Sequence, residues 1–281
     1  MKMYALLKPV RSGLILSVVF GLIIVGCTIQ PLAVEPNDSV TNATANEEIE
    51  KEEKPHWSYS GEVGPEFWGG LSPAFAMCGA GVEQSPIDLA GANDAYLSDI
   101  IFDYASTDLI VLNNGHTIQV NYDSGSAIEV DGEQFNLLQF HAHAPSEHTV
   151  DGESLPIELH LVHQSESGQL AVVGIMIEEG APNEALTTLW ENLPSEETPA
   201  TAIASATINA ADFLPEEQSS FRYMGSLTTP PCSEQVRWHV LTTPITMSAE
   251  QIAAFTDIYN SNNRPVQQLN ARTLVLDETS N

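Results

Sequence analysis

The stretch QFHAHAPSEH, residues 139–148, carries three histidines and a glutamate in a chain with only eight histidines among 281 residues. The segment around it, 134–144, reads QFNLLQFHAHA and has the composition of a β-strand. Side chains alternate along a strand, so Gln139, His141 and His143 are expected on one face. Two imidazoles on one strand face are a suitable geometry for binding a metal ion.

A second segment, PIELHLVHQ at residues 156–164, repeats this pattern. Glu158 and His160 share one face of the predicted strand, and His163 lies on the other. If the two strands are neighbours, three imidazoles converge with one side open, as in catalytic zinc sites with three protein ligands and a water. Gln139 and Glu158, each two residues before a ligand, can accept the free N–H of an imidazole and fix its tautomer.

The metal interpretation competes with a plainer one, because a lone histidine in a strand is usually a hydrogen-bonded structural residue. The H-x-H spacing, the third histidine and the adjacent glutamate together favour a metal site. The pattern does not identify the metal. Four other histidines are out of phase or isolated and are expected to be structural: His56, His148, His163 and His239.

The composition indicates a globular, β-rich protein that does not bind nucleic acid. Hydrophobic residues make up 43% of the chain, and 18 glycines and 17 prolines separate short apolar runs. The clearest helix is predicted at residues 249–260, with Ser248 as its N-cap. The formal net charge is −29, and such an acidic surface repels phosphate backbones. We attribute the acidity to solubility rather than to catalysis.

The first 54 residues have the features of an export signal and a tether. A basic start is followed by LILSVVFGLIIVG and Cys27; the apolar run is too short to span a hydrocarbon core of ~30 Å. Residues 24–27 resemble the lipobox of bacterial lipoproteins, with a plain signal peptide as the alternative. We expect a lipoprotein signal peptide at 1–26, and a lipidated Cys27 that anchors an exported protein to the membrane, facing the periplasm or cell surface.

Residues 27–54 are rich in Asn, Thr, Glu, Pro and Ala and poor in aromatic residues, so this segment is expected to be a disordered acidic linker. Aromatic residues become frequent from residue 56, which predicts a folded catalytic domain at 55–281. Besides Cys27 the chain has Cys78 and Cys232, an even pair in an oxidising compartment. A disulfide between them would add about 3–5 kcal/mol of stability. Two free thiols are the alternative.

Several blocks of the sequence resemble, in chain order, the signature blocks of the α-class carbonic anhydrases, over residues 56 to 275. The blocks are HWSY (56–59), QSPIDL (84–89), NNGHTIQV (113–120), QFHAHAPSEHTVDG (139–152), ELHLVH (158–163), LAVVGI (170–175), GSLTTPPCSEQVRWHVL (225–241) and NNRPVQ (262–267). The resemblance implies an α+β fold: a central, mostly antiparallel twisted β-sheet of about ten strands with peripheral short helices. It also implies reversible hydration of carbon dioxide to bicarbonate and a proton by a zinc-bound hydroxide.

The resemblance assigns roles to individual residues. The implied zinc ligands are His141, His143 and His160. Thr228 matches the family's gatekeeper threonine, Glu147 the glutamate that accepts its proton, and His116 the histidine that shuttles protons. The implied carbon dioxide pocket consists of Val162, Val172, Leu227, Trp238 and Thr229. Thr229 is also counted with the residues implied to order water, which are Tyr59, Asn114 and Gln119. Gln139 and Glu158 match partners of the ligands, and Cys78 and Cys232 match the disulfide of secreted members.

The chain departs from the family's animal members at a few positions. Ala144 and Pro145 stand where those members have an aromatic residue, as is common in bacterial members; Ile118 and Gln119 replace a common Phe and Asn. None of these changes touches a predicted ligand or the pair Thr228 and Glu147. We therefore expect altered water order and turnover rather than loss of activity.

Two other functions are compatible with parts of the pattern. HAHAPSE satisfies H-x-H-x₃-E, which would make Glu147 a ligand of iron or manganese in a cupin jelly roll. That interpretation leaves ELHLVH and SLTTPP unexplained. The second alternative is a catalytically silent lipoprotein with an anhydrase-like fold, although such relatives typically lack a ligand histidine. Carbon dioxide and bicarbonate are the predicted small-molecule partners, and the sequence leaves a homodimer open.

Overall fold

The structure is a computed structural model that describes residues 55–277. The predicted signal peptide (1–26), the lipidation site Cys27 and the linker up to residue 54 lie outside the described residues, as do residues 278–281. None of the helices in the described part is long and apolar enough to cross a membrane.

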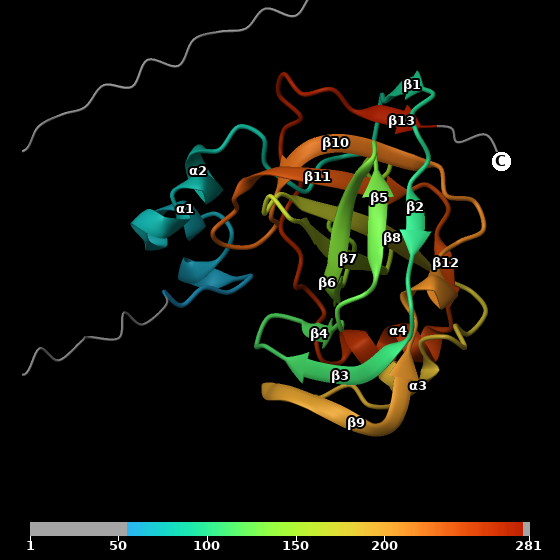
Figure 1. The fold of residues 1–281 in the computed structure, drawn as a ribbon. Helices are drawn as coiled ribbons and strands as arrows, with labels where there is room; N and C mark the ends of the chain where they lie inside the picture. Colours follow the sequence, from blue (N-terminus) through green and yellow to red (C-terminus); the bar gives the residue numbers. More distant parts are fainter. Residues whose placement is uncertain (1–54, 278–281) are drawn as a thin grey trace, which may run out of the picture. The chain divides into compact units, whose positions relative to one another are not determined.

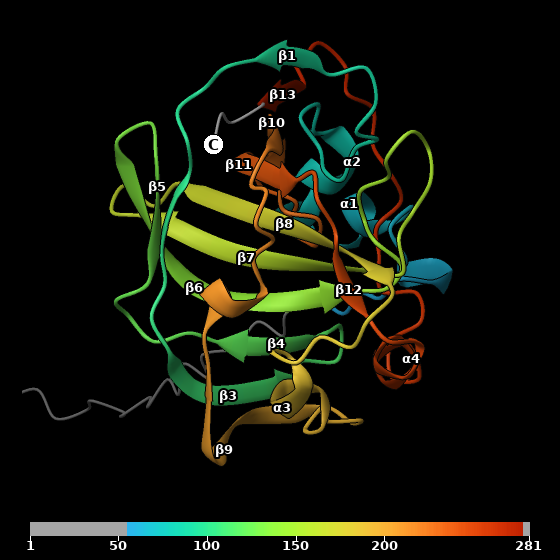
Figure 2. The ribbon, with the colours of Figure 1, turned by 90° about the vertical axis from the view of Figure 1, so that its right-hand side faces the viewer.

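One sheet of thirteen strands dominates the described residues (Figure 1). Ten strands form its main path, which Figure 2 shows from top to bottom. In spatial order they are β1 (Asn93–Ala95), β13 (Val275–Asp277), β10 (Ser220–Ser226), β11 (Glu234–Leu241), β8 (Leu170–Glu179), β7 (Ile157–Ser165), β6 (Glu133–His143), β4 (Ile118–Asn121), β3 (Thr107–Asn113) and β9 (Thr198–Ile208). The other three are β2 (Ile101–Asp103), β5 (Ala127–Val130) and β12 (Ile245–Met247).

Most neighbouring strands in this sheet are antiparallel. The exceptions are the pairs β1 with β13, β11 with β8, and β12 with β8. The predicted fold, a mostly antiparallel sheet of about ten strands with short helices around it, is therefore confirmed.

The helices are short and lie around the sheet (Figure 1). They are the α-helices α1 (Trp68–Leu71), α2 (Met77–Ala80), α3 (Thr187–Trp190) and α4 (Ala249–Thr256), and the 3₁₀ helices η1 (Gly61–Val63), η2 (Pro73–Phe75) and η3 (Ala210–Phe213). Ser248 begins α4 with a capping box that includes Gln251, as the sequence suggests.

The prediction that this last helix reaches residue 260 is wrong, because α4 ends at Thr256. Beyond it the backbone tightens: the amides of Ile258 and Tyr259 both donate to the carbonyl of Phe255. This turn brings the Tyr259 hydroxyl to the side chain of Asn113, at the end of β3. A tertiary contact therefore ends the helix where the local pattern would continue it.

The central strands separate two hydrophobic clusters. Strand β7 is buried along almost its whole length. Its residues Leu159 and Leu161 pack in the larger cluster, whereas Val162 packs in the smaller one, with Val172 and Trp238. Because side chains alternate, the face of β7 that carries Glu158 and His160 is the face turned towards the smaller cluster.

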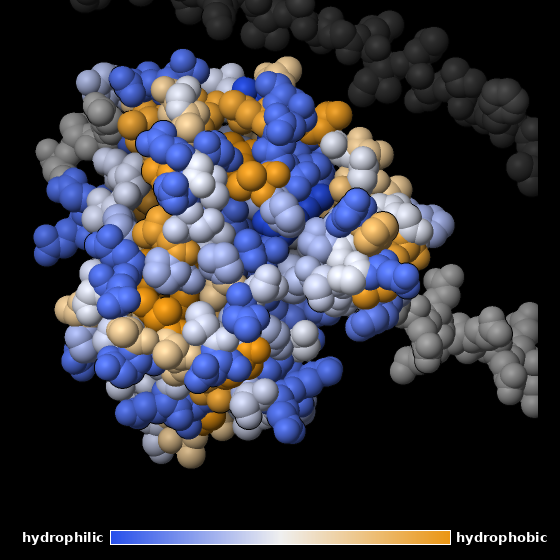
Figure 3. Space-filling model, turned by 180° about the vertical axis from the view of Figure 1, so that it is seen from behind, coloured by the Kyte–Doolittle hydropathy of each residue, from blue (hydrophilic) through white to orange (hydrophobic). Residues whose placement is uncertain are grey.

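Cationic side chains are scarce in the described part of the chain. Residues 55–277 contain no lysine and four arginines, so the surface charge is overwhelmingly carboxylate. The face in Figure 3 is largely hydrophilic, with separate apolar patches. Each arginine donates to protein acceptors, among them Asp277 for Arg222, Glu133 for Arg237, the Cys78 and Ser85 carbonyls for Arg264, and the Met224 and Leu269 carbonyls for Arg272.

Candidate active site

Three histidines from two adjacent strands converge on one point. His141 and His143 lie on β6, and His160 on β7 is the direct cross-strand partner of His141. The ring centroids are 4.9 Å apart for His141 and His143, 5.3 Å for His141 and His160, and 4.7 Å for His143 and His160. One nitrogen from each ring lies within 4.8 Å of the other two. The strands are neighbours, as the metal interpretation required.

Each of these rings uses one nitrogen to contact a protein oxygen. His141 Nδ1 donates to Gln139 Oε1 at 2.9 Å, and His143 Nδ1 donates to the Asn262 carbonyl at 2.6 Å. His160 Nε2 lies 3.0 Å from Glu158 Oε1. These partners fix the tautomers, so Nε2 of the first two rings and Nδ1 of the third keep their lone pairs.

The donor set fits a zinc ion. His143 Nε2 is buried and has no hydrogen-bond partner among the described residues. Burial lowers the pKa of all three histidines, that of His143 to about 4, so the rings are neutral at neutral pH. Three neutral imidazoles with lone pairs directed at a shared point are the ligand type that catalytic zinc sites use.

Glu158 links His160 to the backbone and to the His148 side chain. Its Oε2 accepts the backbone N–H groups of Glu147 and His148, each at 2.9 Å, and its Oε1 contacts His148 Nδ1 at 2.8 Å. Burial would raise the pKa of Glu158, but His148 and His160 lower it well below the usual value. The carboxylate therefore stays ionised and holds His160 in position.

His148 also belongs to the network behind the site. Its Nε2 lies 2.7 Å from the Tyr223 hydroxyl, which in turn lies 2.8 Å from Ser85 Oγ. The position of His148, out of phase with the predicted ligands, predicts a structural role for it. It is structural in the sense that its Nδ1 contacts the Glu158 carboxylate and helps to hold it in place.

Glu147 lies beside His160 and interacts with Thr228. Glu147 is buried; its Oε1 accepts the Arg264 N–H at 2.8 Å, and its Oε2 lies 3.8 Å from His160 Nδ1. Burial raises the pKa of Glu147 to about 7, while His160, the Arg264 amide and the Thr228 hydroxyl oppose the rise. The residues that contact Glu147 thus favour its ionised form against the effect of burial.

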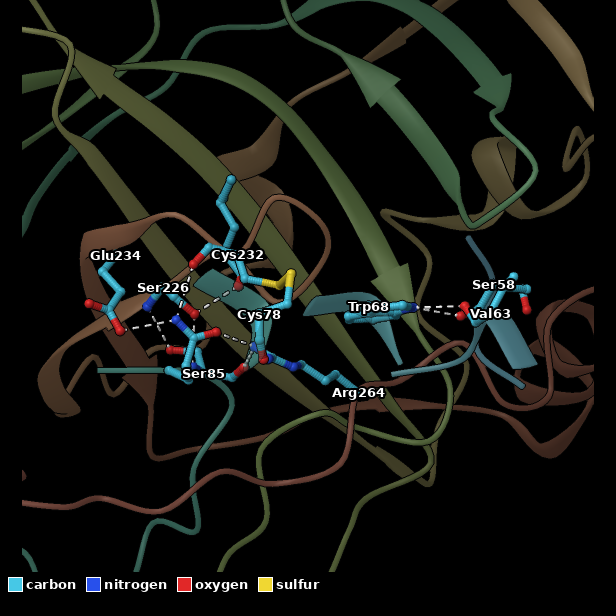
Figure 4. The surroundings of a disulfide bond; sticks show 11 residues. Ser58, Val63, Trp68, Cys78, Ser85, Ser226, Cys232, Glu234 and Arg264 are labelled. Atoms are coloured by element: carbon cyan, nitrogen blue, oxygen red, sulfur yellow. Dashed lines mark hydrogen bonds between the residues drawn. A yellow bond between two sulfur atoms is a disulfide. The ribbon is translucent and has the colours of Figure 1, made fainter. Parts of the chain in front are cut away.

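The loop that carries Thr228 is held at both ends. It joins β10 to β11; the Leu227 amide donates to the Ser233 carbonyl at 3.0 Å, and the Cys232 amide donates to the Thr229 carbonyl at 2.8 Å. Cys232 forms a disulfide with Cys78 of α2, which ties the loop to the N-terminal helices (Figure 4). The pair that the sequence left as a disulfide or two thiols is a disulfide.

The predicted apolar pocket adjoins the histidines. Val162 and Val172 are direct cross-strand partners, Val172 is also paired with Trp238, and the Trp238 ring lies 4.9 Å from the His160 ring. Leu227 packs against the same cluster, and Thr229 is partly buried next to Thr228. These side chains form an apolar wall next to the histidines.

His116 lies at the end of a well-ordered turn between β3 and β4. Asn114 Oδ1 accepts the amide N–H groups of His116 and Thr117, both at 2.9 Å, and Gly115 has a positive φ of 84°. The imidazole is half-buried and stacks on Trp57. Burial and the neighbouring His56 lower its pKa, whereas Glu197 raises it.

The other residues implied to order water occupy different surroundings. Tyr59 has a buried hydroxyl without a hydrogen-bond partner in the described residues, and burial raises its pKa. Gln119, paired with His141 across the strands, donates to Asn121 Oδ1 at 2.8 Å. The side-chain oxygen of Asn114 is already used by its own turn, so only its amide nitrogen remains for water.

Asn262 and Arg264 are site residues that the pattern analysis missed. The Asn262 carbonyl accepts from His143, and its side chain bonds to Ala142 and Ala144; the Arg264 amide binds Glu147. Both lie more than 100 residues after their partners in sequence. The block NNRPVQ, quoted as part of the resemblance, was the one signal that could have found them.

Comparisons with known proteins give a consistent result. The family model for eukaryotic-type carbonic anhydrase matches residues 63–278. A carbonic anhydrase from Nostoc sp. is 48% identical over 225 residues, covering 78% of this chain and 85% of that protein. One from Pectobacterium carotovorum is 43% identical over 221 residues, covering 78% of this chain and 90% of that protein.

Solved structures agree with these relatives. The α-carbonic anhydrase from Thermovibrio ammonificans, in complex with the inhibitor sulfanilamide, has a TM-score of 0.77 and 46% sequence identity. The alignment covers 79% of this chain and 100% of that structure. A hyperthermostable carbonic anhydrase from a hydrothermal vent chimney has a TM-score of 0.76 and 48% identity, with the same coverage.

Proposed function

The chain belongs to the eukaryotic-type, or α-class, carbonic anhydrase family, whose reaction is the reversible hydration of carbon dioxide, and from this premise we propose how its residues carry out that reaction. His141, His143 and His160 would hold a zinc ion. Thr228 and Glu147 would orient the nucleophile, and His116 would carry the proton out. The observation that supports this best is the trio of converging imidazoles, each with one nitrogen within 3.0 Å of a protein oxygen and the other available to a metal.

Zinc in carbonic anhydrases supplies an acidified water, so that hydroxide is available at neutral pH. This chain contributes the conditions for that effect. The three imidazoles are neutral and donate no negative charge, so the metal would keep its full charge. Gln139, Glu158 and the Asn262 carbonyl hold the rings in one tautomer and one orientation.

Thr228 and Glu147 would select the orientation of the attacking oxygen. A hydroxyl that donates its proton to a carboxylate can only accept a further hydrogen bond. With its proton directed at Glu147, Thr228 Oγ1 would accept the hydrogen of a hydroxide and leave a lone pair free to attack. Arg264 holds the other Glu147 oxygen through its backbone amide, which keeps the carboxylate in place for this task.

The substrate side and the proton path follow from the same arrangement. Carbon dioxide is small and apolar, which suits the wall formed by Val162, Val172, Leu227 and Trp238. Each turnover releases a proton inside the site, and an imidazole with a pKa near neutrality can transfer it to buffer. His116 is half-buried at the end of a fixed turn, which suits it to exchange protons with both the site and solvent.

Two alternative functions, a cupin and a catalytically silent relative, compete with this proposal. The cupin interpretation is wrong, because the fold is one twisted sheet of the carbonic anhydrase type rather than a jelly roll.

A catalytically silent relative would not hydrate carbon dioxide, so measuring bound zinc and the hydration rate separates it from an active enzyme. We expect the purified protein to contain one zinc per chain by mass spectrometry and to hydrate carbon dioxide in a stopped-flow assay. Treatment with a zinc chelator should abolish the rate, and zinc should restore it.

A matched pair of variants tests the ligand assignment. His143→Ala should lose both metal and activity. His56→Ala removes an exposed histidine outside the trio and should retain the zinc, which controls for the loss of a histidine as such. A zinc-loaded protein with only the uncatalysed rate, or an unchanged zinc content in His143→Ala, would contradict the proposal.

We also propose that the chain is exported. The disulfide between Cys78 and Cys232 supports an oxidising compartment. A signal peptide at 1–26, a lipid on Cys27 and a linker up to residue 54 would place the domain starting at 55 on a membrane surface. Radiolabelled palmitate should be incorporated by the full chain and not by Cys27→Ser.

Sedimentation of the delipidated protein would decide whether it forms a homodimer.

A further inference from the structure

An exposed carboxylate, Glu197, stands beside the turn that carries His116. Glu197 directly precedes β9 and belongs to none of the blocks that resemble the family. A Cβ atom added to Gly115 would lie 3.5 Å from Glu197 Oε2. The carboxylate therefore packs against the backbone of the residue next to His116.

This proximity is built into the fold. Asn113, at the end of β3, is the cross-strand partner of Thr198 at the start of β9. The Asn113 side chain donates to the Pro194 carbonyl at 2.9 Å and accepts the Gly115 N–H at 3.0 Å. One side chain thus binds both the segment that carries Glu197 and the turn that carries His116, so the two are held at a fixed spacing.

The groups that face His116 come from three parts of the chain. The N-terminal segment contributes the stacked Trp57 ring, His56 and the edge of Tyr59. The segment before β9 contributes Glu197. Burial and His56 disfavour a protonated His116, and Glu197 is the negative charge that opposes them. Tyr259, beyond α4, is also within the electrostatic range of Glu197 and binds Asn113.

We propose that Glu197 is a positioning residue for proton transfer, whose carboxylate stabilises the imidazolium form of His116. This inference rests on the proposed shuttle role of His116. A proton that leaves the active site would pass to His116. The negative charge of Glu197 would stabilise the protonated ring and offset the effect of burial, and the proton would then pass to buffer. Glu197 forms no bond in this process and acts through the charge it places beside the turn.

The test compares Glu197→Gln with Glu216→Gln, which makes the same change of charge at another exposed glutamate, and with Glu197→Asp, which keeps the charge. An NMR titration of the His116 ring in the metal-free protein should give a lower pKa in Glu197→Gln. Glu216→Gln should leave it at the wild-type value, and Glu197→Asp should restore at least part of the shift. An unchanged His116 pKa in Glu197→Gln would overturn the inference.

The zinc-loaded variants add a kinetic readout. In dilute buffer, kcat for hydration should fall about two- to fivefold in Glu197→Gln, because the interaction free energy of an exposed charge pair corresponds to a rate change of that size. The ratio kcat/KM should stay unchanged, because the proton leaves after the substrate has reacted. Dehydration should not slow, since a less basic imidazole gives up its proton more readily. Equal slowing in both directions would indicate a structural effect and overturn the inference.

His116→Ala separates this inference from the proposal on which it rests. If His116→Ala leaves kcat in dilute buffer unchanged, the shuttle assignment itself is wrong. If His116→Ala lowers kcat, added imidazole restores it, and Glu197→Gln has no effect, the shuttle stands and the role of Glu197 is refuted.

Discussion

The imidazole of His116 lies flat on the indole of Trp57, with ring centroids 3.7 Å apart and ring planes within 6° of parallel. Trp57 in turn packs edge-on against Trp68 and Tyr59, with centroids 5.1 and 5.4 Å away. The N-terminal segment of the domain thus packs against the turn that carries His116. The stack removes water from one face of the imidazole and fixes its orientation.

Replacing Trp57 should therefore change the titration of His116. Burial is the main cause that lowers the pKa of this ring, so Trp57→Ala should raise it. Trp57→Phe keeps an aromatic face and should shift the pKa less. An NMR titration measures both, and kcat/KM should stay within about twofold of wild type because the stack is not part of the bond-forming step. A lower His116 pKa in Trp57→Ala would contradict this account.

Thr228→Ala should slow the reaction while zinc stays bound. The variant loses the hydroxyl that orients the attacking oxygen, and the loss of one such group typically costs about a hundredfold or more in rate. Stopped-flow hydration and metal analysis on the same preparation test this. Thr201→Ala, at an exposed position on β9, is the control and should be as active as wild type. A Thr228→Ala enzyme of normal rate would remove Thr228 from the mechanism.

Loss of the disulfide should destabilise the domain and loosen the Thr228 loop. The bridge joins residues 154 positions apart, and a loop of that length corresponds to about 3–5 kcal/mol in the chain-entropy model. Urea denaturation of the double variant Cys78→Ala and Cys232→Ala should show this loss. A reductant should destabilise the wild type and leave the double variant unchanged, which excludes effects of reductant elsewhere.

Two buried histidines on the other side of the sheet should make the protein sensitive to acid. Burial lowers the pKa of His163 and of His239 to about 3 in each case. An unfolded histidine binds a proton below about pH 6.5, and these folded ones do not until about pH 3. Their contribution to stability is therefore complete above pH 6.5. As the pH falls towards 3, each should remove about 1.4 kcal/mol of unfolding free energy per pH unit.

The same two residues should respond oppositely to replacement at neutral pH. His163 Nε2 lies 2.8 Å from the Tyr104 hydroxyl, so His163→Leu leaves that buried hydroxyl unpaired and should destabilise. Neither ring nitrogen of His239 has a hydrogen-bond partner in the described residues, so His239→Leu should stabilise by about 1 kcal/mol. His239→Leu should also flatten the acid dependence. Chemical denaturation at pH 7 and pH 5 tests both expectations, and a less stable His239→Leu at pH 7 would refute the second.

The local pattern could predict the cluster of His141, His143 and His160 because strand parity and H-x-H spacing are short-range signals. His141, His143 and Gln139 had to share a face, and so did His160 and Glu158; only the adjacency of the two strands had to be assumed. The hydrogen-bond acceptor of His143, the Asn262 carbonyl, could not be found from the local pattern. Asn262 reaches His143 only after the chain has crossed the sheet several more times, and its carbonyl is a backbone group that every residue possesses.

The fold itself came from the resemblance more than from periodicity. Strand β7 is buried on both faces, so its burial does not alternate along the strand, and β9 is largely exposed along its length. Parallel pairing of β11 with β8 joins segments more than 60 residues apart and leaves no mark in either one. The end of α4 was misplaced for a related reason, since the contact of Tyr259 with Asn113 is tertiary.

Trypsin, which cuts after lysine and arginine, finds only four sites between residues 55 and 277, and one of them, Arg264, is followed by Pro265. Each of the four guanidinium groups is bound to protein acceptors, and Arg222 and Arg264 are buried. Cleavage would require these side chains to be pulled out of the fold first. Brief digestion of the native protein should therefore leave the domain whole and still active, which offers a practical way to isolate it.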